Sequence, residues 1–372
     1  MQLCYLSDGK LNSLTNSTHR TLTCTTLENY KQRGREIQNR KAWKSQGEGA
    51  MFTGAYSQDA GSFNLTVTGL SKFENRLVFA TNFERGGGLY FKTLDESGLE
   101  TPILADVSLG FFEVDVNLVG RIAVSTCDNS LERHISLLRT NEAYLQTVTE
   151  GDSCDCNPKW SLANPDVLYY DSAGIGYSVT GQFMSYGPRS VYRFNTATGE
   201  LDEVLAGGAY EYYCPFEDAT GNLYYIRRPY KQRSGKMSAI DYIKAPGKIL
   251  RAFGGWLDFV TRRYTGETLK TSGANPAATN QKSPQQIFID GNLLNVEKML
   301  KKNAQAGDKN PGYVPRDWEL VVRTADGEKV LHKSVMSYCV AGDGSIVYSN
   351  GKFIMMKDDV VKAHLAVGMV WG

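Results

Sequence analysis

The sequence predicts an all-β fold, a β-propeller built from four-stranded blades. Short segments rich in aromatic and β-branched residues alternate with turns containing Gly, Asn or Asp along much of the chain. An inner strand followed by a Gly-containing outer hairpin recurs about every 40–50 residues, the period of a propeller blade. The composition, 41% hydrophobic and 22% charged residues, is that of a folded domain and excludes a largely disordered chain.

The clearest repeat covers residues 152–206. An inner segment ends at Trp160, two strands follow at 167–170 and 190–194, and a turn at Gly199 leads into the last strand, 201–205. The alternation of polar and apolar residues in 190–194 is typical of a half-buried strand. We therefore interpret each repeat as one four-stranded blade.

The repeats predict six blades in one domain, residues 1–372, with five or seven blades as alternatives. The units are 1–60, 61–106, 108–150, 152–206, 208–334 and 335–372. A β-sandwich also has short strands and frequent turns, but it does not require this fixed period. The last unit is short, and we expect residues from the N-terminus to complete it and close the ring, which removes exposed sheet edges.

One repeat resembles a known family. Residues 157–166, Asn-Pro-Lys-Trp-Ser-Leu-Ala-Asn-Pro-Asp, followed by Leu-Tyr-Tyr at 168–170, resemble the Pro-x-Trp-Ser-Pro-Asp-Gly motif of TolB-like propellers. Residues 192–200 are similar to that family's outer hairpin. The resemblance covers 152–226 and 335–350 and concerns architecture only, since this chain replaces the Ser-Pro-Asp-Gly turn with Ser-Leu-Ala-Asn-Pro-Asp. Because the family includes binding proteins, peptidase-associated propellers and lyases, it implies a fold without a function.

Catalytic motifs are missing from the sequence. There is no Gly-x-Ser-x-Gly nucleophile elbow, no Gly-Lys-Ser/Thr phosphate loop and no calcium-binding loop. The close cysteine pair, Cys154-Asp-Cys156, would share one face of a strand, and we interpret it as two small packing residues in preference to a metal or redox site. We therefore predict no catalytic residues, no metal and no cofactor, and favour a protein that is not an enzyme.

An alternative function uses the funnel at one end of the central channel. Residues of inner strands would supply such a site for a small ligand or for a hydrolase- or lyase-type reaction. The candidates, chosen only by their placement, are Lys159, Trp160, Tyr213 and Tyr338.

Residues 227–316 interrupt the repeat in what we count as the fourth blade. Residues 227–270 contain eleven Lys and Arg and three Asp and Glu, a net charge of +8 within a chain whose net charge is +1. Residues 246–264 are typical of an amphipathic helix, 271–284 of a mobile loop, and Leu293–Asn303 of a second short helix. The residues predicted to contact a partner or membrane are Ile249, Arg251, Phe253, Trp256, Leu257, Val260, Arg262 and Arg263.

Three interpretations apply to the basic amphipathic helix. In the first it would pack on the rim of the propeller, in the second it would dock onto a protein partner, and in the third it would bind an anionic membrane surface. Nucleic acid is disfavoured because the aromatic residues lie on the apolar face and not among the basic residues. We predict a non-catalytic scaffold that binds a protein partner through rim loops and this insertion, with membrane-surface binding as an alternative.

The sequence also bears on localisation. The first residues contain no basic region followed by an apolar one, and no stretch has the ~18 apolar residues of a membrane span. Seven scattered cysteines are typical of reduced thiols. We expect a cytoplasmic protein, with a mature secreted form as the alternative.

Overall fold

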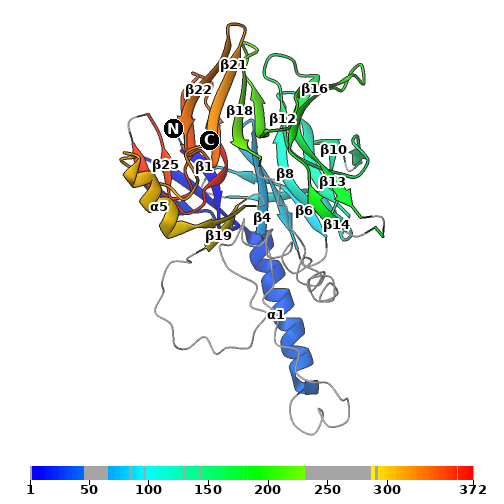
Figure 1. Ribbon diagram of the computed structural model, residues 1–372. Coiled ribbons are helices and arrows are strands. Elements are labelled where there is room, and N and C mark those ends of the chain that lie inside the picture. The colour runs from blue at the N-terminus through cyan, green and yellow to red at the C-terminus, as the bar shows by residue number, and fades with distance from the viewer. Residues whose placement is uncertain are drawn as a thin grey trace.

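The computed structural model is a ring of six antiparallel sheets, each with a path of four strands, which confirms the predicted propeller (Figure 1). The structure describes residues 2–45, 66–230 and 286–371, apart from positions 84, 85, 96, 97, 129, 130, 143, 179, 182, 290, 291 and 358. The predicted amphipathic helix at 246–264 and the loop at 271–284 lie outside these residues. So do the eight residues assigned to the partner or membrane helix.

The sheets succeed one another around the ring, and the first strand of each is nearest the central channel. The closing sheet contains β27 (Val367–Trp371), β1 (Gln2–Ser7), β2 (Lys10–Thr15) and β3 (Thr18–Thr21). The next contains β4 (Thr66–Phe73), β5 (Arg76–Asn82), β6 (Gly87–Thr93) and β7 (Glu100–Asp106). It is followed by β8 (Gly110–Val116), β9 (Arg121–Cys127), β10 (His134–Arg139) and β11 (Gln146–Thr147).

The remaining three sheets follow in chain order. The first contains β12 (Ser153–Trp160), β13 (Val167–Tyr177), β15 (Ser190–Asn195) and β16 (Leu201–Leu205), with β14 (Phe183–Tyr186) beside β13. The second contains β17 (Tyr210–Glu217), β18 (Leu223–Pro229), β21 (Glu319–Thr324) and β22 (Gly327–Lys333). The third contains β23 (Ser337–Val340), β24 (Ile346–Ser349), β25 (Phe353–Met355) and β26 (Val360–Lys362).

The ring is closed by pairing between the two termini. The C-terminal strand β27 pairs with β1, with Leu3 opposite Trp371 and Cys4 opposite Val370. Closure by the termini was expected, but in the opposite sense. The sheet at 337–362 is already complete, and the C-terminal strand completes the N-terminal sheet. Each inner strand of the closed ring thus has a hydrogen-bonded neighbour in its sheet.

The core lies between the sheets. Phe79, Leu77 and Val78 of β5 have almost no exposed surface and divide between two clusters, one toward the closing sheet and one toward β8 and β9. Alternate residues of a strand point to opposite faces, so a buried second strand supplies apolar contacts to both neighbouring blades. This explains why a second strand such as β5 is buried along most of its length while outer strands, such as β7 and β22, are largely exposed.

The long connections all leave one end of the ring. Because strands alternate in direction, the links from fourth to first strands and from second to third strands lie at the same end. The three long links, residues 22–65, 178–189 and 230–318, are all of these two kinds. We call this the insertion end, and the opposite end, which carries tight turns, the turn end. Figure 1 shows α1, β14 and β19 at the insertion end.

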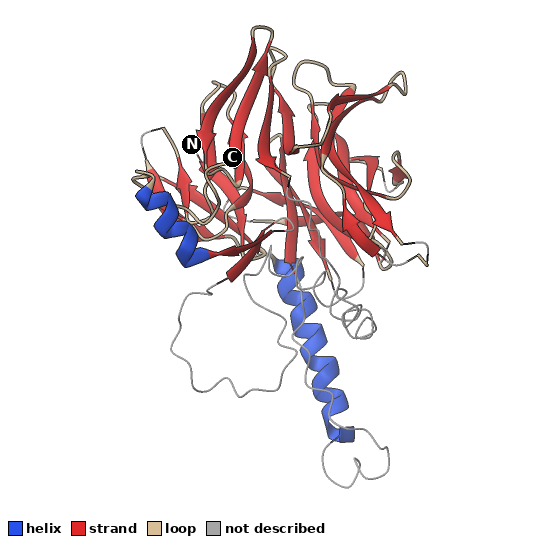
Figure 2. Ribbon diagram, viewed as in Figure 1, coloured by secondary structure: helices blue, strands red, loops and turns tan. Residues whose placement is uncertain are grey.

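Among the residues that the structure describes, helices α1 and α5 lie outside the ring of strands (Figure 2). Helix α1 (Thr25–Ser45) extends away from the insertion end and was not predicted. Helix α5 (Val296–Gln305) follows the hairpin of β19 (Gln286–Ile289) and β20 (Asn292–Asn295) and corresponds to the predicted second short helix. The whole insertion leaves after β18 and returns at β21. The sheet that contains both strands is the fifth when the closing sheet is counted first and the fourth when the closing sheet is counted last.

The start of α1 is fixed by a carboxylate from β7. Glu100 accepts hydrogen bonds from the backbone N–H groups of Thr25 (2.9 Å) and Thr26 (2.8 Å) and pairs with Lys92 at 3.0 Å. An acidic side chain at this position satisfies free N–H groups and complements the positive end of the helix dipole. Although burial opposes the shift, these contacts hold the pKa of Glu100 below its usual value. Tyr30 stacks on Phe83 at 4.6 Å, so the first turns of α1 are anchored to the ring.

Candidate functional site

Three arginines lie at the insertion end, on three neighbouring sheets; Arg133 and Arg228 are buried, and Arg189 is largely buried with its side chain 14% exposed. Each is paired with a carboxylate, and we call the six side chains the arginine cluster. Its pairs are Arg133–Glu113 at 3.4 Å, Arg189–Asp171 at 2.6 Å and Arg228–Glu211 at 2.6 Å. Buried charges require such partners, because an isolated ion loses most of its solvation energy in the interior.

Aromatic rings surround these guanidinium groups. The Arg133 guanidinium lies 3.6 Å from the ring centroid of Phe112. The Arg228 guanidinium lies 3.6 Å from the centroid of Tyr213 and 4.4 Å from that of Trp318. A cation over a desolvated ring face is attracted by the ring quadrupole, with an energy of about 2 kcal/mol. Since Arg228 precedes the insertion and Trp318 ends it, this contact joins the two points where the insertion leaves and rejoins the sheet.

Asp171 is the most enclosed acid of the cluster. Besides Arg189, its carboxylate accepts hydrogen bonds from the side chain of Asn157 (2.6 Å) and from the backbone N–H of Cys214 (2.9 Å). Burial raises the pKa of Asp171 to about 6, against the lowering effect of Arg189 and of these hydrogen bonds. The carboxylate therefore connects β13 to the inner strand β17 of the next blade.

The two cysteines of β12 meet the arginine cluster. Their Sγ atoms are 3.7 Å apart, so the side chains do share one face of the strand. The Cys154 sulfur lies 3.6 Å from Nη2 of Arg189, and the Cys156 sulfur lies 3.7 Å from Nη1 of Arg133. Both thiols are buried beside Ile175 and Tyr186.

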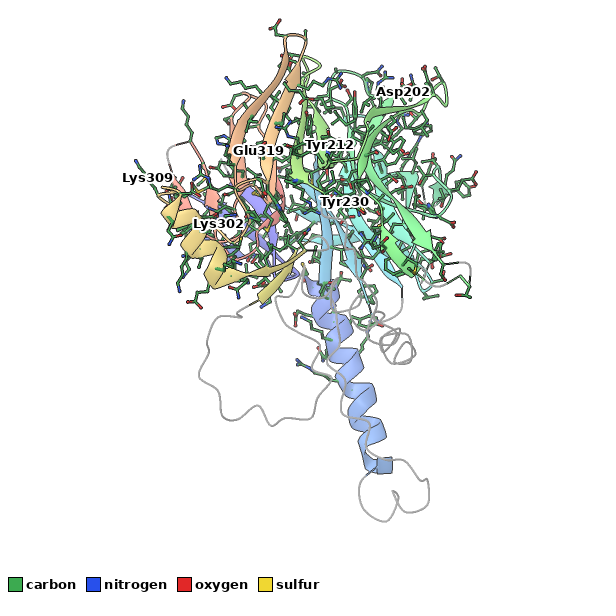
Figure 3. All side chains as sticks on the ribbon, in the orientation of Figure 1. Asp202, Tyr212, Tyr230, Lys302, Lys309 and Glu319 are labelled. Carbon is green, nitrogen blue, oxygen red and sulfur yellow. The ribbon has the colours of Figure 1, made fainter. Side chains whose placement is uncertain are left out.

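A depression of about 660 Å³ opens beside Ile175, which packs in the same buried cluster as these thiols. Gly174, Gly176, Gly187 and Gly208 form much of its wall, together with Ile175, Ser185, Pro188 and Tyr230. A Cβ atom built at Gly174 or Gly208 meets nothing within 4 Å, so glycine keeps this space open. The hydroxyl of Tyr230, the residue after β18, donates a hydrogen bond to the backbone carbonyl of Tyr186 in β14. Figure 3 labels Tyr230 on the ribbon. The depression is open to solvent and exposes backbone more than side chains.

The four predicted funnel residues do not form one site. Trp160 is 2% exposed and packs in the core. Lys159, at the turn end of β12, forms an ion pair with Asp115 of the neighbouring blade at 2.8 Å. Tyr213 lies beside Arg228, and the Tyr338 hydroxyl donates to the Cys214 carbonyl at 2.6 Å. The structure therefore brings Tyr213 and Tyr338 close to one strand, β17, and places Lys159 and Trp160 elsewhere.

The sequence reasoning did not identify the arginine cluster. Arg189 and Asp171 are 18 residues apart, and Arg133 and Glu113 are 20 apart, with no motif joining them. The signal in the sequence was an arginine at one end of each of three strands: Arg133 and Arg189 directly precede β10 and β15, and Arg228 lies near the end of β18. A charge in that position needs a buried partner, but only the packing of blades identifies the partner.

The described residues contain neither a metal-binding cluster nor a membrane-crossing helix. Among the described residues, no three His, Cys, Asp or Glu side chains are arranged to hold a metal ion. Within the same part of the chain, no helix is sufficiently long and apolar to cross a membrane.

Comparison with known proteins supports the fold. No family model and no curated protein sequence matches the chain. The crystal structure of TolB from Acinetobacter baumannii matches all of this chain and 66% of its own length, with 10% identity and a TM-score of 0.50. The chain thus spans just under two thirds of that protein, and at this identity the likeness concerns architecture alone. The fold is a TolB-like six-bladed propeller, as the residues at 157–170 predicted.

Propellers of other activities match less well. An oligogalacturonate lyase in complex with manganese matches 63% of this chain and 57% of its own length, with 11% identity and a TM-score of 0.37. A prolyl endopeptidase structure matches 94% of this chain and 49% of its own length, with 12% identity and a TM-score of 0.37. These values do not select an activity for this chain.

Proposed function

We propose that this chain is a non-catalytic propeller whose insertion end binds a protein partner. The observation that carries the proposal is the concentration of all long connections at one end of the ring. Loops on a rigid scaffold are the usual place for recognition, because they vary without disturbing the core. At the turn end, by contrast, the turns are short and hold their shape through internal hydrogen bonds.

Helix α1 supports the proposal by its placement and charge. Leu27 and Gly34 are buried, whereas Asn29, Arg33 and Arg35 of the same helix are exposed. The helix contains six Lys and Arg and two Glu. Residues 231–270, which follow β18, contain nine Lys and Arg and three Asp and Glu, a net charge of +6, so positive charge is concentrated in two segments that leave the same end of the ring. The remainder of the chain is acidic, so an acidic protein surface is the complementary partner.

A site-specific photocrosslinking experiment tests this proposal. A photoreactive amino acid is placed at Asn29 on α1 or, as the matched control, at Ala219 in an exposed turn at the turn end, and cells of the native host are irradiated. We expect a discrete adduct from Asn29 and none from Ala219, and the adduct should be sensitive to protease and not to nuclease. Adducts of equal yield at both positions, a nuclease-sensitive adduct, a lipid adduct or no adduct would each contradict the proposal.

Charge reversal then separates electrostatic recognition from chance contact. Arg33→Glu with Arg35→Glu should remove the Asn29 adduct, because both side chains are exposed and would attract an acidic surface only through their charge. Lys329→Glu with Lys362→Glu reverses the same number of exposed charges on outer strands and should leave the adduct unchanged. Loss of the adduct in both double variants would indicate a general charge effect and contradict recognition through α1.

The glycine-lined depression favours a second candidate, the binding of a small ligand. Filling it with Gly174→Val adds a side chain where no atom lies within 4 Å, so the fold should tolerate the change. In a thermal-shift screen of a metabolite mixture, a ligand at 100 times its dissociation constant stabilises by about 2.7 kcal/mol. A hit that Gly174→Val removes would support this candidate, and a hit that persists in the variant would place the ligand elsewhere.

A further inference from the structure

Cys154 and Cys156 form a buried dithiol at the insertion end. Their sulfurs are 3.7 Å apart, and the two side chains are 6% and 2% exposed. A sulfur pair at this separation needs a further approach of less than 2 Å to form a disulfide, whose bond is about 2.05 Å long. The sequence pattern favoured a packing role for the pair, but it could not show the charged groups that surround the sulfurs.

Two guanidinium groups contact the dithiol, one at each sulfur. Arg189 contacts the Cys154 sulfur at 3.6 Å, and Arg133 contacts the Cys156 sulfur at 3.7 Å. Each arginine also holds a carboxylate, Asp171 or Glu113, which fixes its position. A thiolate is the nucleophilic form of cysteine, and adjacent positive charge stabilises it. The dithiol thus has what a buried, inert cysteine lacks, two fixed cations aimed at its sulfurs.

The environment makes the two sulfurs unequal. A hydrogen bond from the Cys156 thiol, with the charges of Arg189 and Arg133, holds the pKa of Cys154 well below its usual value, although burial opposes this. The same hydrogen bond and burial raise the pKa of Cys156. Elsewhere in the chain, burial raises the pKa of Cys4 to about 11 and those of Cys24 and Cys339 to about 12.

We propose that Cys154 and Cys156 are a peroxide-reactive dithiol, with Cys154 as the attacking sulfur and Cys156 as the resolving one. The Cys154 thiolate attacks one oxygen of hydrogen peroxide, the O–O bond breaks, and sulfenic acid and hydroxide form. The Cys156 sulfur then attacks the Cys154 sulfur, the S–O bond breaks, and a disulfide and water form. In total, two thiols and one peroxide give one disulfide and two waters, and two equivalents of a small thiol restore the reduced pair.

The depression gives a small oxidant a route to the sulfurs. Ile175 belongs to the same buried cluster as both cysteines and also lines the depression, so its side chain connects the surroundings of the dithiol to a solvent-open space. Hydrogen peroxide is close to water in size, whereas larger disulfides are excluded by the 6% and 2% exposure of the two residues. This favours hydrogen peroxide as the substrate over a protein disulfide.

The test uses the folded, reduced full chain and hydrogen peroxide. After brief exposure the remaining thiols are alkylated under denaturing conditions, and the chain is digested with trypsin. Both cysteines fall in one peptide, residues 140–159, because cleavage follows Arg139 and Lys159. We expect this peptide to escape alkylation and to be lighter by two hydrogen atoms, at a rate roughly tenfold or more above the oxidation of Cys24. Dithiothreitol should return both thiols.

Variants assign the two roles. Cys156→Ser should accumulate a sulfenic acid on Cys154 that dimedone traps, Cys154→Ser should give no fast reaction, and Cys24→Ser should match the wild type. Thermal unfolding identifies any variant that does not fold. The peroxide experiment on the wild-type chain tests the proposal without the variants. Three results would each overturn the proposal. They are full alkylation of the 140–159 peptide after peroxide, oxidation of this peptide no faster than that of Cys24, and sulfinic acid without a disulfide.

Discussion

Arg228→Met is expected to destabilise the ring strongly, because it leaves a buried carboxylate without its cation. Arg228 is 2% exposed, its Nε donates to Glu211 at 2.6 Å, and its guanidinium also donates to the Tyr213 hydroxyl. Methionine retains much of the apolar stem of arginine, so the change isolates the charge more than the volume. Glu211 is 8% exposed and would stay buried.

The magnitude follows from the burial of the pair. Removing one partner of a buried ion pair costs about 3–5 kcal/mol, whereas an exposed pair is worth about 0–1 kcal/mol. The matched control is Arg193→Met, since Arg193 and Asp202 form a pair at 3.2 Å with side chains 31% and 47% exposed. Figure 3 shows Asp202 at the turn end, on the opposite side of the ring from α1. The expected difference between the two variants is therefore about 3 kcal/mol.

Urea denaturation measures both variants and a double variant. In Arg228→Met/Glu211→Leu the uncompensated charge is gone, and such replacements often restore stability to near the wild-type value. We expect the double variant to recover most of the loss at an unchanged denaturant slope. The reasoning is refuted if Arg228→Met costs no more than Arg193→Met, or if removing Glu211 as well deepens the loss.

Three further changes test separate parts of the structure. Glu100→Gln removes the charge that caps α1 and pairs with buried Lys92. We expect the free energy of unfolding to fall by about 3 kcal/mol and amide hydrogen exchange at Thr25 and Thr26 to become faster. Unchanged exchange at these two residues would contradict the role of Glu100 as a cap. Asp171 binds its proton more tightly in the folded state than in the unfolded state. Its contribution to the free energy of unfolding therefore falls by about 3 kcal/mol as pH rises from 3.8 to about 6. Asp171→Asn should lack this dependence of the free energy of unfolding on pH. Gly69→Ala places a Cβ against the backbone of Phe112 and Val114 and should lower the free energy of unfolding by about 1–3 kcal/mol, while Gly342→Ala, with open space, should not.

The sequence was sufficient to predict the propeller because blades are local. Each hairpin pairs strands that follow one another closely, so strand period and turn residues predict the blades directly. Helix α1 escaped prediction because its sequence is mostly polar. Leu27, Tyr30 and Gly34 face the ring in a mostly polar segment, so no apolar stripe marks it. The direction of ring closure was also missed, since the short strands at 353–362 left too little pattern to show a complete blade.

The candidate site could not be predicted in the same way because its contacts cross between blades. Arg228 and Trp318 are joined by a cation–π contact but flank a long insertion. Tyr338 donates to the Cys214 carbonyl across 124 residues. Such pairs depend on how neighbouring blades pack, and neither strand period nor residue spacing encodes that. The cysteine pair was visible in the sequence, whereas its arginines were separable from other surface charges only in the folded ring.

The topology of the ring explains why added chain accumulates at one end. Turn-end connections close hairpins, and their polar groups form hydrogen bonds within the turn. In one such turn, the Asp218 carboxylate accepts hydrogen bonds from the backbone N–H groups of Thr220 and Asn222. These bonds hold the pKa of Asp218 below its usual value, although burial opposes the shift. Lengthening such a turn would break these bonds. At the insertion end, the links from fourth to first strands already cross between blades. There the contact between Arg228 of β18 and Trp318, which directly precedes β21, joins the two points where the long insertion leaves and rejoins the sheet. This contact ties one member of the arginine cluster to the same end that we propose for binding.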